Sequence, residues 1–208
     1  MKHLFAQFVL LLICSAGISQ TRTQTIYLSG HGCDDAVKWE FFCTGGANSG
    51  KWTRIDVPSC WELQGFGSYQ YGNELPRHAF NCEGIADEQG LYRHSFTVPS
   101  SWRGSHVELV FEGSMTDTDV KVNGISAGPV HRGAFYRFSY DVSDLLRYGR
   151  RNLLEAAVSK ESADSTVNVA QRRADYWNFG GIFRPVYLVR KPACYIDRVA
   201  IDARADGS

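Results

Sequence analysis

Short segments in which apolar and polar residues alternate recur along this chain, and they constrain its fold more than any other feature. A period of two places every second side chain on one face of a β-strand. Turn residues separate the segments, as at Pro99 and at the hairpin-forming pair Asn123 and Gly124. Because no long amphipathic helix pattern intervenes, the sequence predicts an all-β fold, an antiparallel β-sandwich. The expected strands cover residues 92–98, 107–111, 120–122, 136–142, 154–158 and 182–189.

The segment before these strands has a different character. Residues 20–90 are rich in glycine, aromatic and polar residues, and we interpret them as irregular loops laid over the sandwich. Residues 1–19 have the order of a secretory signal peptide: a charged start, an apolar run to Cys14 and then small residues. That run is shorter than the roughly 20 apolar residues that span a bilayer, so we expect export to the periplasm or beyond, with no membrane span. The alternatives are lipidation of Cys14 and a retained N-terminal anchor.

The last residues resemble the start of another domain. Residues 193–208 alternate again, with Ile196, Val199 and Ile201 apolar, and they end in a turn. A strand without partners would expose an unpaired edge. We therefore expect a signal peptide at 1–19, one sandwich domain at 20–192 and, at 193–208, the first strand of a domain that is cut short.

Charge and cysteine content exclude some partners. Lysine plus arginine and aspartate plus glutamate number 22 each. With no basic stripe visible, nucleic acid is not an expected partner. The cysteines show neither a CxxC pair nor a Cys/His cluster, so no zinc site is expected. Cys33 and Cys43 could close a small loop in an oxidising compartment, or the thiols could be small buried hydrophobic groups.

The candidate functional residues lie in residues 175–188, where an acidic, aromatic loop joins an expected strand through Gly180 and Gly181. Adjacent glycines indicate that the backbone closely approaches another segment. The carboxylate of Asp175 could accept two hydroxyl groups of a sugar, and the ring of Trp177 could lie against its apolar C–H face. The alternative is that Asp175 caps a turn and the rings fill the core. For Arg184 we expect a structural pairing with a carboxylate inside the domain.

Four motifs occur in order along residues 39–190: WTRIDVPSCWE at 52–62, GLYRHSF at 90–96, VKVNG at 120–124 and DYWNFGGIFRPVYL at 175–188. Together they resemble glycoside hydrolase family 2, the group of β-galactosidases, β-glucuronidases and β-mannosidases. The resemblance implies a jelly-roll, galactose-binding-domain-like sandwich at the N-terminus of a larger hydrolase that cleaves terminal β-glycosidic bonds, and the signal peptide predicts that this hydrolase is exported. In that family an immunoglobulin-like domain follows, whose first strand would be residues 193–208, and then a TIM barrel.

The resemblance also implies partners and roles. The catalytic carboxylates of the family lie in the barrel and act by the retaining mechanism, so no glutamate of this chain can be given a catalytic role. The implied partners are a carbohydrate substrate and the two following domains, and a homo-oligomer is compatible with the family. No cofactor is expected in this chain, although the full-length enzyme could hold a monovalent or divalent cation.

Two positions can be carried over from the family motifs. Asp175 matches an aspartate that reaches into the barrel's pocket and contacts the sugar, and that ligates a monovalent cation in some β-galactosidases. Asn73 resembles a sugar-contacting asparagine in a Y-x-N-x-x-Y-P loop, although here the second tyrosine is missing and the proline is shifted by one. The expected substrate-binding residues are therefore Asp175, Asn73 and Trp177. The alternative functions are a stand-alone carbohydrate-binding module and a purely structural sandwich.

Overall fold

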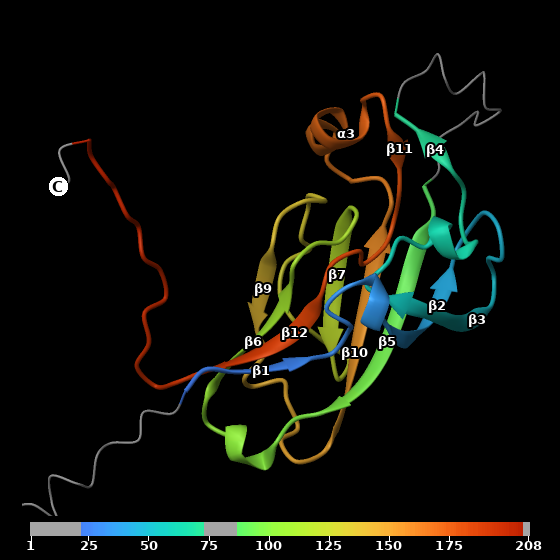
Figure 1. Ribbon diagram of the computed structural model, residues 1–208. Helices are drawn as coiled ribbons and strands as arrows, with labels where there is room; N and C mark the ends of the chain where they lie inside the picture. The colour runs from blue at the N-terminus through green and yellow to red at the C-terminus, as the bar shows by residue number, and fades with distance from the viewer. Residues whose placement is uncertain (1–21, 73–86, 206–208) are drawn as a thin grey trace, which may run out of the picture.

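The computed structural model describes residues 22–72 and 87–205. Two antiparallel sheets form the layers of a β-sandwich, and a small two-stranded sheet lies at one end (Figure 1). The strand orders are β1-β12-β6-β9, β3-β2-β5-β10-β7-β8 and β11-β4. The predicted antiparallel β-sandwich is confirmed, while its jelly-roll connectivity stays a prediction. The strands are β1 (Gln24–Tyr27), β2 (Val37–Cys43), β3 (Trp52–Val57), β4 (Gln70–Tyr71), β5 (Gln89–Thr97), β6 (His106–Phe111), β7 (Asp117–Val122), β8 (Ile125–Ser126), β9 (Phe138–Asp141), β10 (Arg151–Ser159), β11 (Trp177–Asn178) and β12 (Val186–Lys191).

The core lies between the two large sheets because their strands alternate as expected. In β10, Leu154, Ala156 and Val158 are buried, while the residues between them face outward and are only partly covered. Aromatic side chains from neighbouring strands fill the centre, with the rings of Phe41 and Tyr92 4.8 Å apart between centroids. Burial of such apolar surface is the dominant favourable term in folding.

The expectation that residues 20–90 are loops laid over the sandwich is wrong. Strand β1 pairs with β12 in the four-stranded sheet, and β2 and β3 form one side of the six-stranded sheet. The inward residues of β2 alternate correctly, with Trp39 and Phe41 buried. The outward residues Phe42 and Trp52 are also apolar, which hides the period of two.

Other elements also differ from the expectation. The last long strand, expected at 182–189, begins only at Val186. The residues before it are hydrogen-bonded to the loop after β3 instead, since the N–H of Ser59 donates to the carbonyl of Ile182 at 2.8 Å. An α-helix, α3 (Ser165–Arg172), was not predicted. It is short and mostly polar, and Asp164 caps it by accepting the N–H of Thr166 at 2.9 Å. The shorter 3-10 helices are η1 (Cys33–Asp35), η2 (Glu62–Gln64) and η3 (Ser100–Trp102).

The expected strand after residue 192 is not formed in the described part of this chain. Residues 195–205 belong to no strand, and the red segment runs away from the sandwich in Figure 1. Ile196, Val199 and Ile201 are 81%, 68% and 86% exposed. In residues 22–72 and 87–205 no strand pairs with this segment, so its alternating pattern does not by itself form a strand. A further domain after residue 192 stays a prediction.

Two further predictions concern the cysteines and the N-terminus. Cys33 and Cys43 are both free thiols, with Cys43 buried, so the small disulfide loop is not formed. The signal-peptide prediction, Cys14 included, lies outside the described residues. Among the helices of residues 22–72 and 87–205, none is long and apolar enough to cross a membrane.

Strand β10 provides a test of the layer arrangement. We expect Leu154→Ala to lower the free energy of unfolding by about 2–5 kcal/mol, because it leaves a cavity between the sheets. Leu153, its neighbour on the outward face, is the matched control, and Leu153→Ala should cost much less. Urea denaturation of both variants measures the difference, and equal losses would contradict the burial pattern.

Candidate functional site

The predicted site residues Asp175 and Trp177 lie at one end of the sandwich, where β4 and β11 pair (Figure 1). In that pair Trp177 is opposite Tyr71. The hydroxyl of Tyr71 donates to Oδ1 of Asp175 at 3.0 Å. The ring of Trp177 meets the rings of Tyr71 and Tyr69 edge-on, at 5.1 Å and 5.7 Å between centroids. The structure thus brings a carboxylate and three aromatic rings together.

Asn73, the remaining predicted site residue, lies outside the described residues. The chain is described up to Gly72, one residue before it. A Cβ at Gly72 would lie 2.1 Å from the carbonyl oxygen of Ala174, and the N–H of Gly72 donates to the carbonyl of Tyr176 at 2.9 Å. The backbone that leads into Asn73 is therefore packed directly against the loop that carries Asp175.

The hydrogen bond between Tyr71 and Asp175 defines the polarity of the site. The carboxylate of Asp175 accepts this bond and thereby raises the pKa of the Tyr71 phenol. Tyr71 consequently stays a neutral donor at physiological pH. A carboxylate can accept more than one hydrogen bond, so Asp175 can receive a ligand hydroxyl beside Tyr71.

A pocket of about 210 Å³ opens next to this group. Its walls are largely aromatic and apolar, and they come from β11, from the end of α3 and from two loops of the sandwich. Such walls suit the apolar face of a ring-shaped ligand, and Trp177 is the residue that this pocket shares with the Tyr71–Asp175 group. Residues lining it include Met115, Phe135, Tyr176, Trp177 and Phe179.

The paired glycines approach another segment closely, as their sequence predicted. A Cβ at Gly180 would lie 2.1 Å from Cζ2 of Trp61, and the carbonyl of Gly180 accepts the N–H of Trp61 at 3.0 Å. Gly181 has φ +122°, a conformation that L side chains rarely adopt, and a Cβ there would meet the carbonyl of Ser59 at 2.8 Å. The end of the site loop is thus fixed by backbone contacts with residues 59–61.

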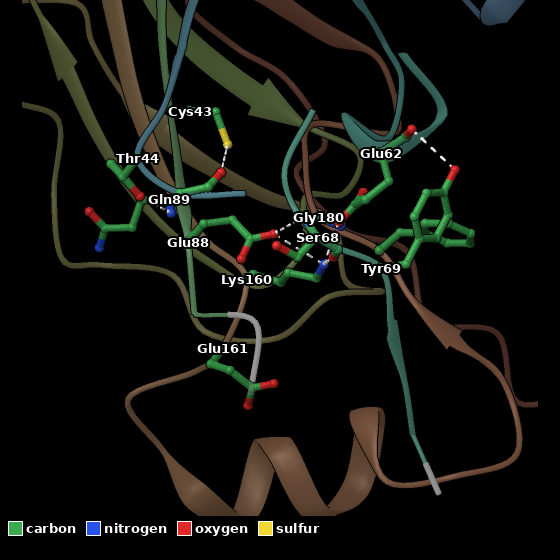
Figure 2. Close-up of polar contacts among 12 residues, drawn as sticks. Cys43, Thr44, Glu62, Ser68, Tyr69, Glu88, Gln89, Lys160, Glu161 and Gly180 are labelled. Carbon is green, nitrogen blue, oxygen red and sulfur yellow. Dashed lines mark hydrogen bonds and ion pairs between the residues drawn. The ribbon is translucent and has the colours of Figure 1, made fainter. Parts of the chain in front are cut away.

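A buried ionic cluster adjoins Gly180 (Figure 2). The ammonium of Lys160 lies 2.6 Å from Oε1 of Glu62 and 3.4 Å from Oε1 of Glu88, and the side chains are 0%, 0% and 4% exposed. Lys160 also donates to the carbonyl of Ser68. The carboxylate of Glu62 in turn accepts the N–H of Gly180, at 3.1 Å and 3.0 Å to its two oxygens. Burial raises the pKa of Glu62, and the neighbouring Lys160 ammonium opposes that rise.

This cluster joins the chain segments that carry the site. Ser68 leads into β4, Glu88 precedes β5, Lys160 follows β10, and Gly180 ends the loop that begins at Asp175. Trp61 and Glu62, which follow β3, are 0% and 2% exposed and belong to the core. Lys160 and Glu88 were missed, because a lysine and a glutamate at strand ends normally face solvent.

Arg184 has the structural position expected of it but a different partner. Its Nη1 donates to the carbonyl oxygens of Phe135 and Glu112, at 3.2 Å and 3.4 Å, rather than to a carboxylate. Its guanidinium lies 5.0 Å from the centroid of the Phe183 ring. The prediction that Arg184 pairs with a carboxylate was therefore wrong, because its guanidinium donates to the backbone carbonyls of two loops instead.

The described residues do not by themselves form a cation site at Asp175. In residues 22–72 and 87–205, no group of three or more His, Cys, Asp or Glu side chains is placed to hold a metal ion. Asp175 would contribute a single carboxylate, which is too few ligands for a dedicated site.

The fold and the site define this chain as a β-sandwich domain with a polar, aromatic site at one end. Residues 44–192 match the family model described as glycosyl hydrolases family 2, sugar binding domain. The chain belongs to that family, and the resemblance read from its four motifs is confirmed.

Similar proteins carry the names of glycoside hydrolases. A β-galactosidase of Alteromonas mediterranea is 32% identical over 158 residues, which cover 75% of this chain and 15% of that protein. A β-galactosidase of Priestia megaterium is 29% identical, over 76% of this chain and 15% of that protein. A β-glucuronidase of Bacteroides fragilis is 26% identical, over 65% of this chain and 17% of that protein. The matched part of this chain thus spans about one sixth of these relatives.

Solved structures support the fold. The crystal structure of a putative β-galactosidase from Bacteroides fragilis superposes with a TM-score of 0.59 at 23% identity, covering 82% of this chain and 23% of that chain. A β-D-glucuronidase structure for Dictyoglomus thermophilum has a TM-score of 0.56 at 19% identity, covering 86% and 30%. At these identities the likeness establishes the β-sandwich and not the ligand.

Because the cluster is buried, replacing its lysine should cost much more folding stability than replacing an exposed, paired lysine. We expect Lys160→Met to lower the free energy of unfolding by about 3–5 kcal/mol, because it leaves Glu62 and Glu88 buried without their cation. Lys38, which pairs with Asp56 at 2.9 Å in an exposed position, is the control. Lys38→Met should cost at most about 1 kcal/mol.

Urea denaturation of the two lysine variants compares these losses. Adding Glu62→Gln to Lys160→Met removes one stranded charge and should restore part of the stability. Equal losses for the two lysines would contradict a supporting role of the cluster.

Proposed function

We propose that this chain is the sugar-binding part of an exported family 2 glycoside hydrolase, similar to β-galactosidases, that cleaves terminal β-glycosidic bonds. In this proposal Asp175 accepts hydroxyl groups of the terminal sugar, and Trp177 lies against its C–H face. Asn73 adds a further polar contact from the segment that follows β4. The catalytic carboxylates belong to a barrel elsewhere in the full-length enzyme.

The observation that supports this proposal most is the Tyr71–Asp175 pair at the rim of the sandwich. The phenol orients the carboxylate at 3.0 Å, and the rings of Tyr69 and Trp177 stand beside it. Tyr69 is 50% exposed. A site of this kind, open on one side, is suited to close around a sugar when a second domain covers it. The names of the relatives favour a β-galactoside or a β-glucuronide.

A stand-alone carbohydrate-binding module remains the second candidate, because the same sandwich serves in both roles. Under that candidate the chain would bind sugar at the β4–β11 end without help from a barrel. Half of a pocket binds weakly, since few contacts must offset the full cost of immobilising the ligand. We therefore favour the composite site.

Asp175 provides the direct test of the proposal. In the enzyme expressed from the whole reading frame, Asp175→Ala should lower kcat/KM for a nitrophenyl β-glycoside by about 10- to 150-fold, the loss of about 1.5–3 kcal/mol of hydrogen bonding to a charged group. Asp144→Ala, an exposed aspartate in a turn of the sandwich, is the matched control and should change nothing.

The same assay has two further outcomes. The isolated 208-residue chain should give no turnover, because it is proposed to lack the catalytic carboxylates. If the isolated chain hydrolyses the glycoside, the composite site is wrong. If Asp175→Ala leaves kcat/KM of the full-length enzyme unchanged, the alternative of a purely structural sandwich is favoured instead.

Export is a separate part of the proposal. We expect the signal peptide to be removed before Gln20, so that the mature protein begins there. Mass spectrometry of the protein from the periplasm or medium measures this mass. A chain that retains residues 1–19, or that carries a lipid on Cys14, would contradict simple export.

A further inference from the structure

The outward face of the six-stranded sheet carries a row of charges of alternating sign. Across β3, β2, β5, β10 and β7, the residues directly opposite one another are Arg54, Glu40, Arg93, Glu155 and Lys121. All five project away from the core. Of these side chains, Arg93 and Glu155 form an ion pair, with Nε and Oε1 3.2 Å apart, and an exposed pair of this kind contributes little to folding stability.

A second row on the same face is mostly apolar and runs beside the first. Its members, again directly opposite in register, are Trp52, Phe42, Leu91, Ala157 and Asp119. Trp52 is 44% exposed, which is unusual for so large an apolar side chain. Ala157 has the smallest side chain of the row, and it lies between Leu91 and Asp119, whose side chains are larger.

The small side chain of Ala157 leaves a depression of about 180 Å³ in the sheet face. On the β5 side, the guanidinium of Arg93 lies 4.3 Å from the ring centroid of Trp52, and its Nε donates to Glu155 at 3.2 Å. On the β7 side stand Asp119 and Lys121. The depression thus has an apolar floor and walls that offer both hydrogen-bond donors and acceptors.

The charges of these walls balance, and that restricts the ligand. Arg93 and Lys121 are cations, while Glu155 and Asp119 are anions. An anionic ligand would meet two carboxylates, and a cationic ligand would meet the guanidinium and the ammonium. A neutral sugar avoids both repulsions, because each hydroxyl can donate to a carboxylate and accept from a cation. Its C–H face suits Leu91, Ala157 and the ring of Trp52.

We propose that this depression is a second carbohydrate-binding site, for a neutral sugar ring, on the outward face of the six-stranded sheet. It shares no residue with the Asp175 site at the β4–β11 end. It therefore does not depend on the proposed hydrolytic function. A glycan held here is bound without being cleaved.

The test is a titration of the 208-residue chain, labelled with ¹⁵N, with galactose, lactose and neutral β-linked oligosaccharides. Amide shifts should change in β5, β7 and β10 around Ala157, with dissociation constants in the millimolar range that suits a shallow site. Ala157→Leu fills the depression from the solvent side and should weaken binding by about tenfold or more. Ser95→Leu adds a similar side chain to the same face outside the depression and should leave binding unchanged.

Three further measurements make the outcome decisive. Thermal unfolding of both leucine variants establishes that they fold. Trp52→Ala should weaken binding, because it removes one of the apolar side chains that line the depression. Asp175→Ala should leave these shifts unchanged, which separates this site from the proposed function. The proposal is overturned if no neutral sugar shifts these amides, or if the shifts lie only at β4 and β11. It is also overturned if glucuronate binds more tightly than the neutral sugars, or if Ala157→Leu and Ser95→Leu change the dissociation constant equally.

Discussion

One lysine ammonium, buried between two glutamate carboxylates, supports the end of the sandwich on which the candidate site depends. Charges removed from water are costly unless they are paired and hydrogen-bonded. Lys160 has Glu62 and Glu88 as partners, and Glu62 uses its remaining acceptor capacity on the N–H of Gly180. Satisfying the buried charge thereby also sets where the loop carrying Asp175 returns to the sandwich.

The molecule presents two surfaces of different chemistry on this frame. The β4–β11 end carries a carboxylate that is hydrogen-bonded to Tyr71 beside aromatic rings, and Tyr69 is half exposed there. The outward face of the six-stranded sheet carries balanced charges around a shallow apolar floor. The first arrangement suits a domain that completes a pocket with a neighbour. The second is complete within this chain, because every wall of the depression comes from β3, β5, β7 and β10.

The strands that could be predicted are those with one buried face and one polar face. Strand β10 is an example, since apolar and polar residues alternate along it. Strands β2 and β3 were missed because Phe42 and Trp52 face outward although they are apolar, and these residues belong to the row that borders the sheet-face depression. Helix α3 was missed because eight mostly polar residues show little helical periodicity, and its cap at Asp164 is the main local signal.

The sequence by itself determined the all-β class, the close approach of the paired glycines and the family. It also placed Asp175 and Trp177 in one short segment, because each of these features is carried by neighbouring residues. Only the tertiary structure decided that the hydroxyl of Tyr71 donates a hydrogen bond to Asp175, which is 104 positions away in the sequence. It also decided that Lys160 is buried. Such contacts follow from how the sheets and loops pack, and a carboxylate or an ammonium looks the same in sequence whether it meets water or another chain segment.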